Sequence, residues 1–88
     1  MTHEVFHQLI GYDRTSGGVA VEYQIPPQVL DYAKAVAGVG SDDPEAVLCY
    51  RLNSHQARDI AGAIGAKIDS LAFNFYMEGC AEPLRASA

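Results

Sequence analysis

Basic side chains are scarce in this chain of 88 residues, which has six lysines and arginines against eleven aspartates and glutamates. The formal net charge at neutral pH is therefore −5. Nucleic acids are polyanions that are bound by clustered lysine and arginine, whereas the six bases here are scattered along the sequence. The charge argues against direct binding of nucleic acid and favours a basic protein partner.

Cysteine is also rare, because only Cys49 and Cys80 are present. Small secreted domains that depend on disulfides usually have more cysteines, so we interpret both as free thiols in a reducing compartment. The first residues contain no apolar run of the signal-peptide type, and no segment approaches the ~20 apolar residues of a membrane span. We therefore expect a cytoplasmic protein, or one exported by a route that leaves no N-terminal mark, with no membrane span.

The three histidines do not form a metal-binding pattern. His3 and His7 fall on a predicted strand, where residues four apart are separated by ~13 Å, too far to share one ion. His55 stands alone at the start of a predicted helix. We expect no metal site and no cofactor.

The sequence also lacks a catalytic constellation. A nucleophilic serine or cysteine needs a positioned base, and Ser54 and His55 are helical neighbours that do not face each other. Cys49 falls within a predicted strand, where a thiol more often packs in a core than acts as a nucleophile. Residues 38–41 resemble a glycine-rich phosphate loop but lead into two aspartates, which would repel phosphate. We predict no catalytic residues and no enzymatic activity.

The amino-acid composition fits one small globular domain. Apolar residues make up 49% of the chain and charged residues 19%, which argues against global disorder. A chain of this length builds one hydrophobic core. We assign residues 1–80 to a single domain and residues 81–88, which are mostly small, to a flexible C-terminal tail.

The first half of the chain has the pattern of a β-hairpin followed by a helix. Alternating apolar residues predict strands over 5–12 and 19–25, separated by a glycine-containing turn. Apolar residues three and four apart then predict a helix over 27–37. Pro27 suits its first turn, and Gly38 is a natural stop.

The second half predicts a strand over 46–52, a helix over 53–66 and a strand over 71–78. Asn53 and Gln56 have the spacing of a capping box at the start of the helix. The last strand alternates between large apolar residues on one face and mixed residues on the other. Its apolar face comprises Leu71, Phe73, Phe75 and Met77.

The order of elements is β-β-α-β-α-β. The connection between the third and fourth strands is long enough for a right-handed crossover to a parallel strand. We therefore predict an α+β two-layer sandwich, with one four-stranded mixed sheet and both helices on one face.

The other face of this sheet is a candidate interface. In the last strand it presents Asn74, Tyr76 and Glu78, with a large aromatic side chain between polar ones. Faces of this kind often bind a partner or a second copy of the same chain. The alternative is an ordinary solvated face on which Arg51 pairs with Glu22 or Glu78.

A second candidate is the acidic loop cluster, which we define as Asp42, Asp43 and Glu45. Its carboxylates suit calcium chemically, but the spacing does not match the D-x-[DN]-x-[DN]-G loop. The remaining interpretations are a solvated loop and a docking edge for a basic partner.

Three motifs together resemble a group of small uncharacterised bacterial α+β proteins. They are the "DDP" loop at 42–45, the "CY.L" strand at 49–52 and the aromatic final strand at 73–78. The resemblance implies the α+β fold and transfers no catalytic residue. In size and acidity such proteins also resemble the immunity partners of bacterial toxins.

These observations lead us to expect a non-enzymatic protein-binding module of the immunity or inhibitor type. The acidic loop cluster would steer a basic partner, and Asn74, Tyr76 and Glu78 would contact it. One alternative is a structural homodimer formed through the same face. Another is a small ligand-binding domain or enzyme, which would require a pocket with several convergent polar groups.

Overall fold

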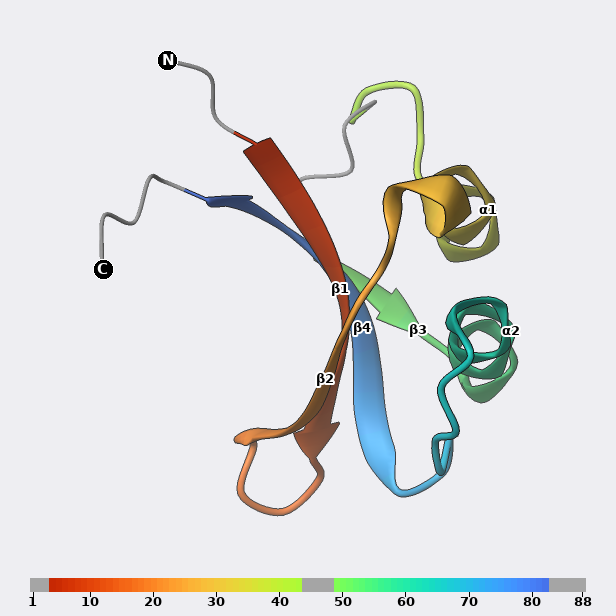
Figure 1. The fold of residues 1–88 in the computed structure, drawn as a ribbon. Helices are drawn as coiled ribbons and strands as arrows, with labels where there is room; N and C mark the ends of the chain where they lie inside the picture. The colour runs from red at the N-terminus through yellow and green to blue at the C-terminus, as the bar shows by residue number, and fades with distance from the viewer. Residues whose placement is uncertain (1–3, 44–48, 83–88) are drawn as a thin grey trace.

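A computed structural model of the chain describes residues 4–43 and 49–82, and its elements follow the order β-β-α-β-α-β (Figure 1). The predicted α+β class is confirmed. The elements are β1 (Glu4–Asp13), β2 (Val19–Gln24), α1 (Pro27–Ala37), β3 (Cys49–Leu52), α2 (Ser54–Ile64) and β4 (Phe73–Glu82).

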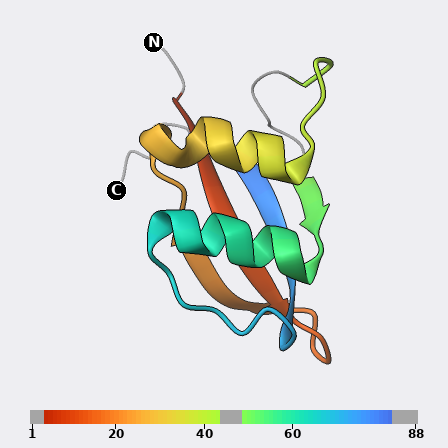
Figure 2. The ribbon, with the colours of Figure 1, turned by 90° about the vertical axis from the view of Figure 1, so that its right-hand side faces the viewer.

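The four strands form one sheet in the order β2-β1-β4-β3. Every pairing is antiparallel, so the expectation of a mixed sheet with a parallel crossover was wrong. The reason is the path of the chain after β3. The helix α2 runs across the strands, and residues 65–72 return along its length, so that the chain enters β4 from the end at which β3 stops (Figure 2).

Both helices lie on the same face of the sheet, as predicted (Figures 1 and 2). They pack side by side and run in opposite directions, and α1 carries the chain from the edge strand β2 towards the other edge strand β3. The result is a two-layer arrangement in which one face of the sheet is covered and the other is open. Neither described helix is long and apolar enough to cross a membrane.

The ends of the helices follow from local chemistry. The side chain of Asn53 accepts from the amide of Gln56, and the side chain of Gln56 accepts from the amide of Asn53, both at 2.8 Å, so the capping box is confirmed. Gly38 and Gly65 end the two helices with φ of 77°, the left-handed conformation that glycine adopts without a steric penalty. The second helix therefore ends at Ile64, slightly earlier than expected.

The core lies between the sheet and the helices. Leu9, Phe75 and Met77 point into it from the sheet, and Ile60 packs on them from α2. Gly11 lies opposite Phe75 on the same face. A β-carbon at Gly11 would stand 2.8 Å from an edge carbon of the Phe75 ring, so the absence of a side chain lets that ring pack close to β1.

Several predicted boundaries shift. Leu71 lies in the turn before β4 and is 72% exposed, so it does not belong to the apolar face of that strand. At its other end β4 extends to Glu82, two residues into the segment that we assigned to a tail. The predicted strand residues 46–48 lie outside the described residues, as do residues 83–88.

Candidate functional site

The face of the sheet that the helices leave uncovered is the first candidate surface, and we call it the open face. Strand alternation defines it, because Leu9 and Met77 point towards the helices and their neighbours point the other way. The open face includes Ile10, Tyr12, Glu22, Cys49, Arg51, Asn74, Tyr76 and Glu78.

Three half-buried side chains interact at the centre of the open face. The hydroxyl of Tyr12 donates to Oε2 of Glu78 at 2.5 Å. The rings of Tyr12 and Tyr76 meet edge to face, with their centroids 5.4 Å apart. The hydrogen bond to Glu78 first, and burial second, raise the pKa of Tyr12 to about 12. Tyr12 is therefore a protonated donor at neutral pH.

Cys49 lies beside this cluster on the open face. Its thiol donates to the same Oε2 of Glu78 at 3.5 Å, and the side chain is exposed, which differs from the interpretation of a core thiol. Desolvation and the charge of Glu78 raise the pKa of the Cys49 thiol. A raised pKa lowers the fraction of reactive thiolate, so the site does not activate Cys49 as a nucleophile.

An open depression of about 470 Å³ borders the cluster and is also lined by the turn between β1 and β2. In this turn the carboxylate of Asp13 accepts from the amides of Thr15 at 2.8 Å and Ser16 at 2.9 Å. These hydrogen bonds lower the pKa of Asp13 and fix the turn. The depression therefore has one rigid wall and one wall of aromatic and carboxylate side chains.

Asp43, one residue of the acidic loop cluster, contacts the helix-covered side of the sheet and not the open face. Asp43 is buried, and its carboxylate accepts from the hydroxyl of Tyr50 at 2.6 Å. Tyr50 packs against the core on the helix-covered side of the sheet, and its hydrogen bond to Asp43 raises its pKa to about 12. Asp42 is exposed in the connection after α1, and Glu45 lies outside the described residues.

Among the predicted site residues that the structure describes, those of the last strand and Asp43 thus lie on opposite sides of the sheet. Asn74, Tyr76 and Glu78 share the open face, as expected from alternation. Asp43 binds a side chain of the opposite face, and it acts in the structure as a buried partner of Tyr50. The proposed pairing of Arg51 with Glu22 or Glu78 is not formed, since no ion pair joins these three described residues.

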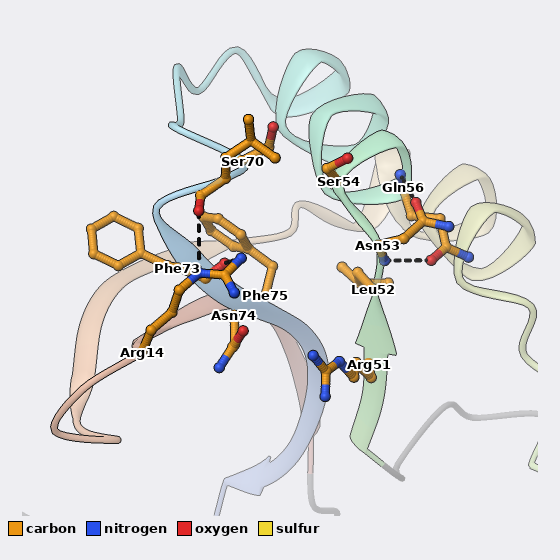
Figure 3. Close-up of a pocket in the computed structure, with 11 residues that line it drawn as sticks. Arg14, Arg51, Leu52, Asn53, Ser54, Gln56, Ser70, Phe73, Asn74 and Phe75 are labelled. Carbon is orange, nitrogen blue, oxygen red and sulfur yellow. Dashed lines mark hydrogen bonds between the residues drawn. The ribbon is translucent and has the colours of Figure 1, made fainter.

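A second hollow, of about 540 Å³, lies at the edge of the sheet where β3 passes into α2 (Figure 3). We call it the arginine pocket. It is lined by the polar residues Arg14, Arg51, Asn53, Ser54, Gln56, Ser70 and Asn74 and by the apolar residues Leu52, Leu71, Phe73 and Phe75.

Arg14 reaches this pocket from the turn after β1. Its Nε donates to the carbonyl of Leu71 at 3.1 Å, and its Nη2 lies 3.4 Å from the carbonyl of Phe73 (dashed lines in Figure 3). These acceptors are far from Arg14 in sequence, so neither pattern nor spacing reveals the contact. The sequence did not identify Tyr12 as a site residue either, because its partner Glu78 is also far away in the sequence. Its alternation with Ile10 does place it on the open face.

The histidines and acids of the described residues do not assemble a metal site. No group of three or more histidine, cysteine, aspartate or glutamate side chains within residues 4–43 and 49–82 has the geometry to hold an ion. His7 is buried in β1. His3 lies outside the described residues.

Comparison with known proteins gives one match. A family model described as "Domain of unknown function (DUF7683)" matches residues 8–78, a segment that contains both helices, the open-face residues and the arginine pocket. A search of curated proteins and a search of solved structures found no match.

Proposed function

This chain belongs to the DUF7683 family, and we propose that it is a non-enzymatic protein-binding module that docks a basic protein on its open face. The observation that carries the proposal is the segregation of the two layers. Both helices cover one face of the sheet, and the other face holds two tyrosines and a glutamate beside an open depression.

Tyrosine suits this role because it offers a large contact area with only two rotatable side-chain bonds. It is enriched in interfaces and in their energetic centres. The edge-to-face contact between Tyr12 and Tyr76, and the hydrogen bond from Tyr12 to Glu78, hold these side chains before a partner arrives. Less rotamer entropy is then lost on binding.

The charge supports a basic partner. Within the described residues, Tyr12 and Cys49 both donate to Oε2 of Glu78, and the other carboxylate oxygen, Oε1, accepts no hydrogen bond. A lysine or arginine of a partner would bind this oxygen while lying against the ring of Tyr76, a cation–π arrangement. The net charge of −5 would speed the encounter at low ionic strength.

We further propose an immunity- or inhibitor-type role, in which the module covers a basic functional surface of a toxin or enzyme. The charge of a small acidic protein with a pre-arranged aromatic and carboxylate face is complementary to such a target. In this role the protein acts by binding its target and needs no catalytic group of its own.

Affinity purification with matched variants tests the proposal. Wild-type protein and the open-face variants Tyr76→Ala and Glu78→Gln are compared with Tyr32→Ala and Asp59→Asn, which alter exposed residues on the helices. We expect a basic protein that is retained by the wild type and by both helix variants, released by salt, and lost with either open-face variant. Retention by all five proteins would reject the open face as the docking surface.

Light scattering of the purified chain separates the homodimer alternative from this proposal. A monomer that captures a basic protein supports heterologous docking. A dimer that Tyr76→Ala converts to monomer would instead assign the open face to a second copy of the chain, and would overturn the proposal of a basic partner.

A further inference from the structure

We propose that the arginine pocket binds a small carboxylate whose remaining atoms are apolar. The pocket shares Arg51 and Asn74 with the open face but does not include Tyr12, Tyr76 or Glu78, and the inference does not depend on the proposed docking of a basic protein. It rests on the charge, the unused donors and the apolar walls of the pocket.

The charge of the pocket is opposite to that of the chain. Eleven acids outnumber six bases in the sequence, yet Arg14 and Arg51 both line this hollow and no aspartate or glutamate does. Neither arginine forms an ion pair within the described residues. Two guanidinium groups that face one hollow without a carboxylate favour the entry of an anion.

Arg14 is fixed in position by the backbone. Its contacts to the carbonyls of Leu71 and Phe73 use two of the five N–H groups of a guanidinium, so three remain for a ligand. Carbonyl oxygens hold the side chain in place without neutralising its charge. Arg14 is therefore a pre-positioned cation at the pocket. Because its side chain is already ordered, less conformational entropy is lost when a carboxylate binds to it.

The other polar lining residues also have unused hydrogen-bonding groups. Within residues 4–43 and 49–82, the side chains of Arg51, Ser54, Ser70 and Asn74 make no hydrogen bond. The capping box of α2, in contrast, is already closed between Asn53 and the next turn of the helix. The inference therefore rests on the donors of Arg14 in the turn, Arg51 in β3 and Asn74 in β4, and on the hydroxyls of Ser54 and Ser70.

The apolar walls of the pocket indicate that the rest of the ligand is apolar. Leu52 and Phe75 are buried and form an apolar floor, and Phe73 meets Phe75 edge to face with centroids 6.1 Å apart. Leu71 is 72% exposed and also lines the pocket. A volume of about 540 Å³ lies within the range of small-molecule sites, so a ligand body can cover this apolar surface.

A carboxylate fits this surrounding better than phosphate does. Guanidinium and carboxylate groups are both planar and pair through two parallel hydrogen bonds. Phosphate carries more charge and would have to shed more hydration beside leucine and phenylalanine side chains. The geometry therefore points to an aromatic or branched aliphatic monocarboxylate.

The test is titration with benzoate, followed by the backbone amide NMR shifts of the whole chain. We expect shifts at residues 51–54 and 70–75 and a dissociation constant in the millimolar range. Arg51→Gln should weaken the affinity roughly tenfold, the effect of removing a charge-assisted hydrogen bond. Arg51 is exposed, so this variant keeps the fold, which the dispersion of the same spectrum verifies.

Arg58→Gln is the matched control, because Arg58 is exposed on α2 and does not line the pocket. It changes the net charge of the chain by the same amount as Arg51→Gln. Affinity that stays at the wild-type value in Arg58→Gln and falls in Arg51→Gln supports the assignment. An equal loss in both variants would show that only net charge is sensed, and would overturn it.

Two further probes define the ligand class. Benzamide has nearly the shape of benzoate without the charge, and binding of benzamide as tight as that of benzoate would refute a carboxylate site. Inorganic phosphate tests the role of the apolar walls. Phosphate that binds as tightly as benzoate, with the same dependence on Arg51, would overturn the inference of an apolar carboxylate, as would the absence of any shift with benzoate.

Discussion

Leu9 and Tyr12 belong to the same strand but point to opposite faces of the sheet, and they are stabilised in different ways. Leu9 is fully buried beneath the helices, where the removal of apolar surface from water stabilises the fold. Tyr12 is half-buried and satisfied by Glu78. The helices therefore bury most of the apolar core on one face of the sheet, while the other face buries Ile10 and otherwise carries polar and aromatic groups.

The largest difference in unfolding free energy between the two faces should appear when one side chain of β1 is truncated on each face. Leu9→Ala is expected to lower the free energy of unfolding by about 2–5 kcal/mol, because it leaves a cavity in the core. Gln8→Ala, one residue away on the other face, should change it by about 0.5 kcal/mol or less. Urea denaturation measures both. Equal losses would contradict the proposed segregation of stability.

Overpacking the covered face should have the next largest effect. Gly11→Ala would place a β-carbon 2.8 Å from carbons of both Phe75 and Val21 and is expected to destabilise the fold by about 1–3 kcal/mol. The control is Gly62→Ala in α2, where no atom lies within 4 Å of the added carbon. It should stabilise the protein by about 0.5–1 kcal/mol, since alanine is the better helix former. Thermal unfolding that ranks the two variants in the reverse order would contradict the packing argument.

Removing one polar atom from the open face should have a smaller effect. Tyr12→Phe deletes the hydroxyl that binds Glu78 and keeps the ring beside Tyr76, so we expect a loss of about 1 kcal/mol. Tyr32→Phe, on the exposed side of α1, serves as the reference and should be close to neutral. Urea denaturation of the two variants measures the difference, and a loss as large as that of Leu9→Ala would mean that the open face also stabilises the fold.

The smallest expected effect is a change in the pKa of one tyrosine. It distinguishes Tyr12 from Tyr50, which lie on opposite faces of the sheet. Tyr12 and Tyr50 each have a pKa of about 12 because each donates to a carboxylate. Glu78→Gln should lower the pKa of Tyr12 towards the ordinary value and leave Tyr50 unchanged, as followed by NMR of the tyrosine rings. A variant in which both values move would show that the two pairs are coupled through the sheet.

The same two pKa values predict how stability depends on pH. A tyrosine whose pKa is higher in the folded chain than in the unfolded one contributes its full stabilisation below the unfolded value, near 10. That contribution is lost as the pH rises from about 10 to about 12. We expect the urea midpoint to fall over this interval and to fall less in Tyr12→Phe, which has lost one of the two groups.

Local signals in the sequence predicted much of the fold. The alternation of Phe73, Phe75 and Met77 identified the covered face of β4 because neighbouring side chains of a strand must point in opposite directions. Asn53 and Gln56 identified the start of α2, since a capping box involves only four consecutive residues. Elements whose determinants lie close together in the chain were therefore predictable.

The direction of β4 and most of the site were not predictable in this way. A connector long enough for a parallel crossover is also long enough for a helix and a return segment, so its length does not decide the pairing. Arg14 meets the carbonyl of Leu71, and Tyr12 meets Glu78, only because β1 and β4 are neighbours in the sheet. The alternation of Ile10 and Tyr12 does not identify a partner on another strand. Asp43 looked like a surface acid because no local pattern reveals its contact with Tyr50.

The central position of β1 and β4 has a consequence for synthesis on the ribosome. These two strands are the longest in the sheet, and they pair along their whole length. Each is needed to join one edge strand to the rest, yet β4 is translated after every other described element. A nascent chain that has not yet exposed β4 holds a lone hairpin and an unpaired β3. Assembly of the sheet must therefore wait for the final strand, and a truncation before β4 should give an aggregation-prone fragment.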